Sequence, residues 1–501
     1  MFQTSIFKPL FMLFALALLV VSCILVINTI QFSEGTPDPI IHVSDEHASW
    51  YSKIESISLK KALARLSTSI SFKTISRRGN PDSSASEFES LISYLKENYP
   101  FTFNNLEVST FNNYSLLFKW TATAPSKKPI LLLSHSDVVA AQSNDLWDFP
   151  PFSGLISDNK IWGRGTLDNK GTMIAIFETI EALLQSGYQP NRDIYFAVGH
   201  DEEIGGDYGA VAICKHLEEL DIEFDFIVDE GGYFGEGIID GVNKKAALIG
   251  IAEKGYVSLE LSVESTGGHS SKPPTITSTG RLMKAITKVL NKPFDTNLKY
   301  TAMFLKHLGT DLPFSQRLVM ANQSLLPPLP NSLLPKQPEL RAQTQTTMAP
   351  TMLRGSETDN VIPTNPSAVI NFRIIPGETI HSVIEEVADR INDPNVLIKI
   401  FGKATEPPKI SSTDHFGYRV IADTAQQVTG KDVYVAPMLM IATTDSRHYQ
   451  KLTNNIYRFT GLSLNKSNIK TFHGINEHVS VDSFEESIRF YGRLIINSTL
   501  K

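Results

Sequence analysis

The chain has 501 residues, of which 42% are hydrophobic and 20% are charged. This ordinary composition excludes a disordered protein, and the length favours two domains over one. The net charge of −7 gives no sign of the basic surface that binds nucleic acid, so no nucleic-acid partner is expected.

An uncharged apolar segment lies near the N-terminus, at residues 9–27. About 20 apolar residues suffice to cross a bilayer. The apolar core of a signal peptide is shorter, about 7–15 residues. We therefore predict that residues 1–30 form an uncleaved membrane anchor, with the catalytic part on the extracytoplasmic side. A cleaved signal segment on a secreted protein is the alternative, and lipidation at Cys23 ranks third.

The rest of the chain divides by its hydrophobic pattern. Residues 31–46 are polar and contain proline, which is typical of a linker. Residues 47–255 alternate short apolar runs with helical patterns, which predicts an α/β domain with a largely parallel sheet covered on both faces. Residues 256–400 contain strands of alternating polarity and helices, which predicts an inserted α+β domain. Residues 401–501 return to the first domain, because His473 has to reach the site described next.

Acidic and histidine side chains follow several of the predicted strands. Open α/β sheets bind ligands outside the carboxyl ends of their strands. Two histidines, two aspartates and one glutamate can hold two divalent cations if one carboxylate bridges them. Nitrogen and oxygen ligands suit Zn²⁺, although cobalt or manganese could occupy the same positions. The predicted ligands are His135, Asp168, Glu203, Asp229 and His473.

The adjacent acids Glu202 and Glu203 divide two roles between them. Neighbouring carboxylates repel each other unless a cation neutralises one, so we predict that Glu203 is a ligand. Glu202 is then the general base that takes a proton from the attacking water and later gives it to the leaving nitrogen. Asp168, in a glycine-rich loop, is predicted to bridge the metals. In an extended segment Asp137 faces the same way as His135, so it can accept the second imidazole N–H.

Spacing alone does not decide which residue is the metal ligand in two pairs of neighbouring residues. Asp229 is followed by Glu230, and His473 is followed five residues later by His478. The choice of Asp229 and His473 is supported by the family resemblance described next.

Seven motifs together resemble one enzyme family: LLLSHSDVV, WGRGTLDNKGTM, GHDEEIGG, VDEGG, GGHSS, NVIP and HGINE. The family is that of the di-zinc metallopeptidases and aminoacylases. Residues 50–495 look closest to its carboxypeptidase S branch and to the secreted N-fatty-acyl-amino-acid synthase/hydrolase. The resemblance implies a di-zinc, aminopeptidase-like catalytic domain and an inserted lid domain through which such proteins often form homodimers.

The resemblance also implies a role for each matching residue. One zinc ion would be held by His135, Asp168 and Asp229, and the other by Asp168, Glu203 and His473.

Three further residues match substrate-binding positions. His269, in GGHSS, would hydrogen-bond the developing oxyanion, commonly from the partner subunit. Asn360, in NVIP, would contact the substrate. Arg447 would bind a substrate carboxylate, for which the planar guanidinium is well suited.

The match to the family departs from its pattern in two places. The first is Asn169, where relatives often have Asp. In relatives, the peptide bond between the bridging aspartate and this residue is often cis. Thr443 and Thr444 stand where many relatives have Gly-Gly or Gly-Thr. The second departure bears on the shape of the carboxylate pocket.

The sequence therefore predicts a membrane-anchored or exported di-zinc amidohydrolase that cleaves an amide bond next to a free carboxylate. A carboxypeptidase acting on small peptides is favoured, and an N-acyl amino acid hydrolase is the alternative. A non-catalytic binding protein would lack a ligand or the base, and none is missing. A cysteine hydrolase is disfavoured because no catalytic motif surrounds Cys214.

Overall fold

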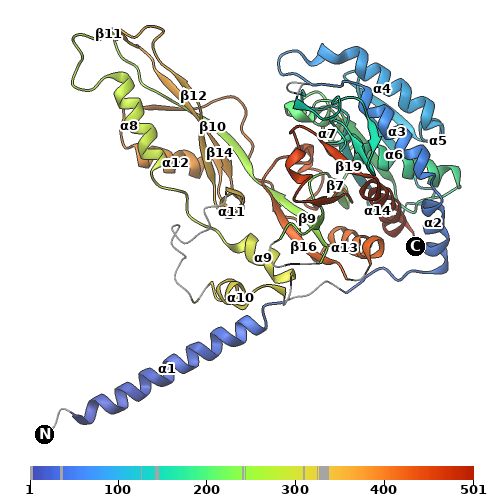
Figure 1. Ribbon diagram of the computed structural model, residues 1–501, viewed down its shortest axis with the longest axis horizontal. Coiled ribbons are helices and arrows are strands. Elements are labelled where there is room, and N and C mark those ends of the chain that lie inside the picture. The colour runs from blue at the N-terminus through green and yellow to red at the C-terminus, as the bar shows by residue number, and fades with distance from the viewer. Residues whose placement is uncertain are drawn as a thin grey trace.

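The computed structural model describes residues 4–33, 38–125, 127–141, 146–239, 242, 244–308, 311–323, 325, 338–430 and 432–500. It contains a long N-terminal helix, a large α/β unit and a smaller unit with its own sheet (Figure 1).

Helix α1 (Thr4–Ile30) projects away from the rest of the molecule (Figure 1). Its segment Phe11–Ile30 is long and apolar enough to cross a membrane, and almost all of its side chains are exposed. A signal sequence would have the same properties. The predicted apolar helix is therefore confirmed, whereas its role as an uncleaved anchor stays a prediction.

The large unit is built on one mixed sheet, with strand order β1-β2-β6-β3-β7-β17-β9-β8-β18 and with β16 paired to β9. Its strands are β1 (Glu107–Phe111), β2 (Ser115–Trp120), β3 (Ile130–His135), β6 (Ile194–Gly199), β7 (Phe226–Asp229), β8 (Tyr233–Glu236), β9 (Ala246–Glu253), β16 (Tyr434–Met440), β17 (Ile456–Arg458) and β18 (Ser463–Asn465). The centre, from β6 through β3 and β7 to β17, is parallel as predicted. Antiparallel pairs lie toward both ends.

Helices cover both faces of this sheet. They are α2 (Asp45–Glu55), α3 (Leu59–Ser71), α4 (Ala85–Asn98), α5 (Pro100–Asn105), α6 (Lys170–Gln185), α7 (Ala210–Glu219), α13 (Phe416–Thr429) and α14 (Val481–Thr499). A small sheet of β4 (Leu155–Ser157), β5 (Lys160–Trp162) and β19 (His478–Ser480) lies beside them.

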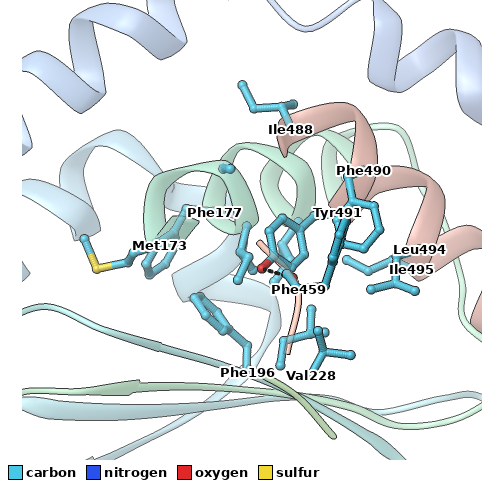
Figure 2. Packing of buried hydrophobic residues seen from close by; sticks show 14 of the residues in the cluster. Met173, Phe177, Phe196, Val228, Phe459, Ile488, Phe490, Tyr491, Leu494 and Ile495 are labelled. Carbon is cyan, nitrogen blue, oxygen red and sulfur yellow. Dashed lines mark hydrogen bonds between the residues drawn. The ribbon is translucent and has the colours of Figure 1, made fainter. Parts of the chain in front are cut away.

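The core of the large unit explains why its central strands are apolar on both faces. Phe177 of α6 and Tyr491 of α14 pack together above Phe196 and Val228 of the sheet (Figure 2). A second apolar cluster joins α7 to the opposite face. A strand buried on both sides has no solvent face, so its sequence is a continuous apolar run.

The smaller unit is inserted between β9 and β16. Its antiparallel sheet has the order β12-β14-β10-β15, with β10 (Gly255–Ser262), β12 (Thr347–Arg354), β14 (Ser367–Ile374) and β15 (Leu397–Ile400). Helices α8 (Ser278–Leu290) and α12 (Ile380–Ile391) pack on it. The pair β11 (Gly268–His269) and β13 (Val361–Ile362) forms its far tip (Figure 1). We call this unit the lid.

Three short helices within the predicted inserted region pack elsewhere. They are α9 (Lys299–His307), α10 (Phe314–Ala321) and α11 (Pro338–Thr344). Helix α9 lies beside β16 of the large sheet, α10 contacts α9 and α1, and α11 contacts α9 (Figure 1). Apolar residues of α9 pack with Leu248 of β9 and Ala436 of β16, and α10 and α11 in turn contact α9.

Candidate metal centre

The sheet brings the predicted ligands to one edge. Strand β3 ends at His135 and pairs in parallel with both β6 and β7. Glu202 and Glu203 follow β6 in a short 3₁₀ helix, and Glu230 directly follows β7. Because parallel strands end at the same edge, these side chains converge.

A first cluster contains His135, Asp168 and Glu230. The Nε2 atom of His135 lies 3.0 Å from Oδ1 of Asp168 and 3.3 Å from Oε1 of Glu230. The three donor atoms lie within 4.8 Å of one another.

A second cluster contains Asp168, Glu203 and His473. The Nε2 atom of His473 lies 3.0 Å from Oδ2 of Asp168 and 3.1 Å from Oε2 of Glu203. Asp168 thus directs one oxygen to each cluster, which is the arrangement of a carboxylate that bridges two cations.

The donor atoms fit a pair of divalent cations. Imidazole nitrogens and carboxylate oxygens are the ligands that Zn²⁺ accepts. The Oε1 atom of Glu203 is buried with no hydrogen-bond partner in the described structure. Burial raises the pKa of Glu230 to about 8, and it also raises the pKa of Glu203. Several buried carboxylates at one point need a positive charge to stay ionised.

At the first open choice, the structure places Glu230 in the first cluster and Asp229 outside both clusters. Its Oδ1 atom accepts a hydrogen bond from the backbone N–H of Glu230 at 2.9 Å, and its Oδ2 atom accepts one from that of Ser446 at 2.8 Å. Successive residues of an extended segment face opposite ways, so only one of the two acids can face His135. Glu230 takes that position, and Asp229 instead holds the segment that begins at Asp445.

At the second open choice, the structure places His473 in a cluster and His478 outside both clusters. His478 lies in β19, where its ring packs 4.4 Å from that of Trp162. The Asp168–Asn169 peptide bond is cis, as the resemblance implies. The Asn169 side chain donates a hydrogen bond to Glu230, so this departure from the family pattern contacts a cluster residue.

Asp137 lies behind the first cluster, where the sequence predicted it. Its Oδ1 atom is 3.2 Å from Nδ1 of His135. Each of its oxygens also accepts a backbone hydrogen bond, from Glu202 at 3.2 Å and from Glu203 at 3.2 Å. Ser76 donates a further bond at 2.5 Å. Asp137 therefore orients the imidazole and also fixes the turn that carries both glutamates.

Glu202 is buried beside the clusters and belongs to neither. Burial and then the charge of Asp445 hold the pKa of Glu202 well above its usual range. The Nη1 atom of Arg447 lies 3.5 Å from Oε1 of Glu202 and donates to the carbonyl of Thr444 at 2.7 Å. The predicted base and the predicted carboxylate-binding residue are thus neighbours.

Two predicted residues lie apart from the clusters. His269 and Asn360 are exposed at the tip of the lid, where β11 pairs with β13. They lie close together, since the N–H of Ser270 donates to the carbonyl of Asn360 at 3.0 Å. In Figure 1 this tip points away from the large sheet. Within one chain, therefore, neither residue reaches the metal ligands.

Glu477 is a site residue to which the sequence analysis assigned no role. It is fully buried, and its Oε1 atom accepts a hydrogen bond from the backbone N–H of Leu167 at 2.8 Å. Its other oxygen pairs with Arg164. Glu477 thus joins the loop that carries Asp168 to the segment that carries His473. An acid placed four residues after a predicted ligand, within HGINE, was the available signal.

The chain is similar to known proteins of one family. The model of the peptidase family M20/M25/M40 matches residues 131–328 and 333–497. The chain is 38% identical to probable carboxypeptidase S-like 2 of Dictyostelium discoideum, over 95% of this chain and 91% of that protein. It is 35% identical to the N-fatty-acyl-amino acid synthase/hydrolase PM20D1 of Mus musculus, over 90% of each. An M20 family metallo-carboxypeptidase from Sulfolobus solfataricus shares the fold, with a TM-score of 0.64, 19% identity and coverage of 87% of this chain and 98% of that one.

Proposed function

Because the chain belongs to peptidase family M20/M25/M40, we propose that it is a di-zinc hydrolase of carboxypeptidase type. Its substrate would be a small peptide whose C-terminal amide bond lies next to a free carboxylate. The observation that carries this proposal is the pair of clusters that share Asp168, with Glu202 beside them.

The two proposed metal sites follow the clusters. His135, Asp168 and Glu230 would hold one ion, and Asp168, Glu203 and His473 would hold the other. When bound, the ions would supply Lewis-acid polarisation of the attacking water and of the scissile carbonyl.

Glu202 acts as the proton carrier in this proposal. It accepts a proton as the oxygen of water bonds to the carbonyl carbon, and it delivers that proton to nitrogen as the C–N bond breaks. Its side chain is buried and lies 3.5 Å from Arg447. Arg447 would bind the substrate carboxylate as a bidentate partner, which places the adjacent amide next to Glu202.

The lid tip completes the site only if it meets the metal centre of another chain or if the lid closes. We favour a homodimer, in which His269 of one chain hydrogen-bonds the oxyanion formed in the other and Asn360 contacts the substrate. The exposure of both side chains in one chain supports this arrangement.

A second candidate activity is the hydrolysis of N-fatty-acyl amino acids. The 35% identity to the Mus musculus enzyme over 90% of its length favours it. Both candidates cleave an amide bond next to a carboxylate, so they share the mechanism and differ in the group on the acyl side.

The membrane position is a further part of the proposal. We assign α1 as an uncleaved anchor that holds the catalytic unit on the extracytoplasmic side, and a secreted protein is the alternative. Sequencing the N-terminus of protein from the membrane fraction tests this. A mature N-terminus that lies after Ile30 would exclude the anchor.

One experiment tests the activity. The full chain in detergent is assayed on an acyl-dipeptide ending in Phe and on N-oleoyl-Phe, before and after chelation and after Zn²⁺ is added back. We expect two zinc ions per chain, loss of turnover on chelation and recovery with Zn²⁺. Preference for the dipeptide supports a carboxypeptidase, and preference for N-oleoyl-Phe supports the second candidate. Unchanged turnover in a metal-free protein would contradict the di-zinc mechanism.

A further inference from the structure

An apolar cavity of about 750 Å³ lies between the α9–α11 helices and the large sheet. Its floor includes Leu248 of β9 and Met438 of β16, and its roof includes Phe304 of α9 and Val319 of α10. None of the residues of the two metal clusters lines it. It is therefore a second site, separate from the one proposed for catalysis.

The lining indicates the chemistry of a ligand. Among the described residues that line the cavity, none has a charged side chain, so an ionic group inside it would lack a counter-charge. Its volume lies within the range of about 300–1,000 Å³ that is typical of small-molecule sites. A hydrocarbon chain in an apolar cavity gains dispersion contacts with its walls and is removed from water.

The lining also contains one polar atom without a partner. The hydroxyl of Thr301, on α9, is buried and makes no hydrogen bond in the described structure. A neutral carbonyl oxygen, such as that of an ester, would satisfy it. The cavity therefore suits a long acyl chain that carries an uncharged linkage.

Helix α10 places this cavity next to the N-terminal helix. Its residues Val319 and Met320 line the cavity, and Asn322, at its end, donates a hydrogen bond to the carbonyl of Leu25 in α1 at 3.1 Å. Asn28 of α1 donates to Asn322 in return at 2.9 Å. Phe314, at the start of α10, is 48% exposed. If α1 crosses a bilayer, α10 lies at the membrane surface.

We infer that the cavity binds one acyl chain of a membrane phospholipid, which enters from the bilayer that holds α1. This inference depends on the membrane position proposed above and not on the hydrolytic activity. The bound chain would fasten the α9–α11 helices to the membrane surface, and thereby also β16 of the large sheet, on which α9 packs.

Photo-labelling tests the inference. The full chain is placed in nanodiscs of phosphatidylcholine that carries a diazirine near the end of one acyl chain, and the labelled peptides are mapped after illumination. We expect label on α9 and α10 at the lining residues, in addition to label on α1. Val319→Trp and Thr301→Phe fill the cavity from two different helices, and each is expected to lower the label on the lining at least ten-fold.

The control is Val108→Trp, on β1 at the opposite end of the sheet, which is expected to leave the labelling unchanged. Thermal unfolding of each variant shows that it is folded. The inference would be overturned if only α1 were labelled. It would also be overturned if the lining residues were still labelled in both the Val319→Trp and the Thr301→Phe proteins.

Retention of the wild-type protein in the source membranes under alkaline extraction is measured before the nanodiscs are prepared. Release would contradict the membrane position of α1, whereas retained protein without lining label would contradict the cavity assignment alone.

Discussion

The residues of the first metal cluster are mostly shielded from solvent and contact one another, whereas His269 and Asn360 at the lid tip are exposed and contact no cluster residue of the same chain. His135 is contacted by Asp137, Asp168 and Glu230, all within 3.3 Å. His269 accepts one local hydrogen bond, from the N–H of Ser271. The metal-binding part of the proposed active site is thus held in place by a single sheet of one chain.

The other part of the site depends on the approach of a second surface. The carboxyl ends of neighbouring parallel strands lie at the same edge of a sheet, so the residues of a single chain form the metal centre. A hairpin at the far end of an inserted unit has no such constraint. The comparison therefore predicts that mutations at the sheet act within one chain, whereas mutations at the lid tip act between chains.

The largest effect is expected from Glu202→Gln, which removes the proposed proton carrier from the metal centre. The turnover number should fall by about 10²–10⁴-fold, since that is the usual contribution of a general base. Zinc content should stay at two per chain, because Glu202 belongs to neither cluster. The control is Asp207→Asn, at a nearby exposed acid that pairs with Lys403. Near-normal turnover with both metals bound would exclude Glu202 as the base.

A somewhat smaller effect is expected from His269→Ala, which removes the proposed oxyanion donor at the lid tip. Loss of an oxyanion donor lowers turnover by about 10²–10³-fold. His381→Ala changes another exposed lid histidine and serves as the control.

Mixing the His269→Ala and Glu202→Gln proteins tests whether the contact is made between chains. A mixed dimer has one site with both residues intact and therefore half of the wild-type activity, so an equal mixture that exchanges subunits at random should return to about a quarter of the wild-type activity. Mixtures that stay as inactive as their parents would show that the lid acts within one chain.

Glu477→Gln should lower Zn²⁺ affinity by about 10–100-fold, which is typical for residues that orient metal ligands. Because Glu477 links the loops of Asp168 and His473, both metal sites should weaken together. His473→Ala should weaken one site only, which provides the comparison. Titration of the apo protein with zinc measures both affinities. An unchanged affinity in folded Glu477→Gln protein would show that the link is not needed for metal binding.

The smallest effect concerns Lys254, which lies between β9 and β10 where the two regions join. Burial lowers the pKa of Lys254 to about 7. In an unfolded chain a lysine pKa is about 10.4, so between these values the unfolded state binds more protons. The free energy of unfolding should therefore rise with pH, by roughly 2 kcal/mol between pH 7 and 9.

The Lys254→Met variant should lack this gain, although it also leaves the carbonyls of Ala342 and Gln345 without their donor. Urea unfolding at both pH values measures the difference between the two proteins. Parallel pH dependence in wild type and variant would contradict the neutral buried lysine.

The sequence by itself determined the features that repeat locally. Apolar residues at helical spacing in 172–184 predicted the helix that the structure contains as α6, and continuous apolar runs predicted the central strands. The edge on which His135, Glu202 and Glu203 gather followed from the order of strands and helices. Local periodicity and burial are properties of short segments, so a single sequence carries them.

The tertiary structure decided what depends on distant segments and on side-chain direction. Glu230 rather than Asp229 faces His135, because the path of the chain after β7 selects one of two adjacent acids. Glu477 bonds to Leu167 across 310 residues, and α9 returns to the large sheet from within the inserted region. Such contacts depend on three-dimensional packing, and no short pattern in the chain records which distant partner a buried polar group will find.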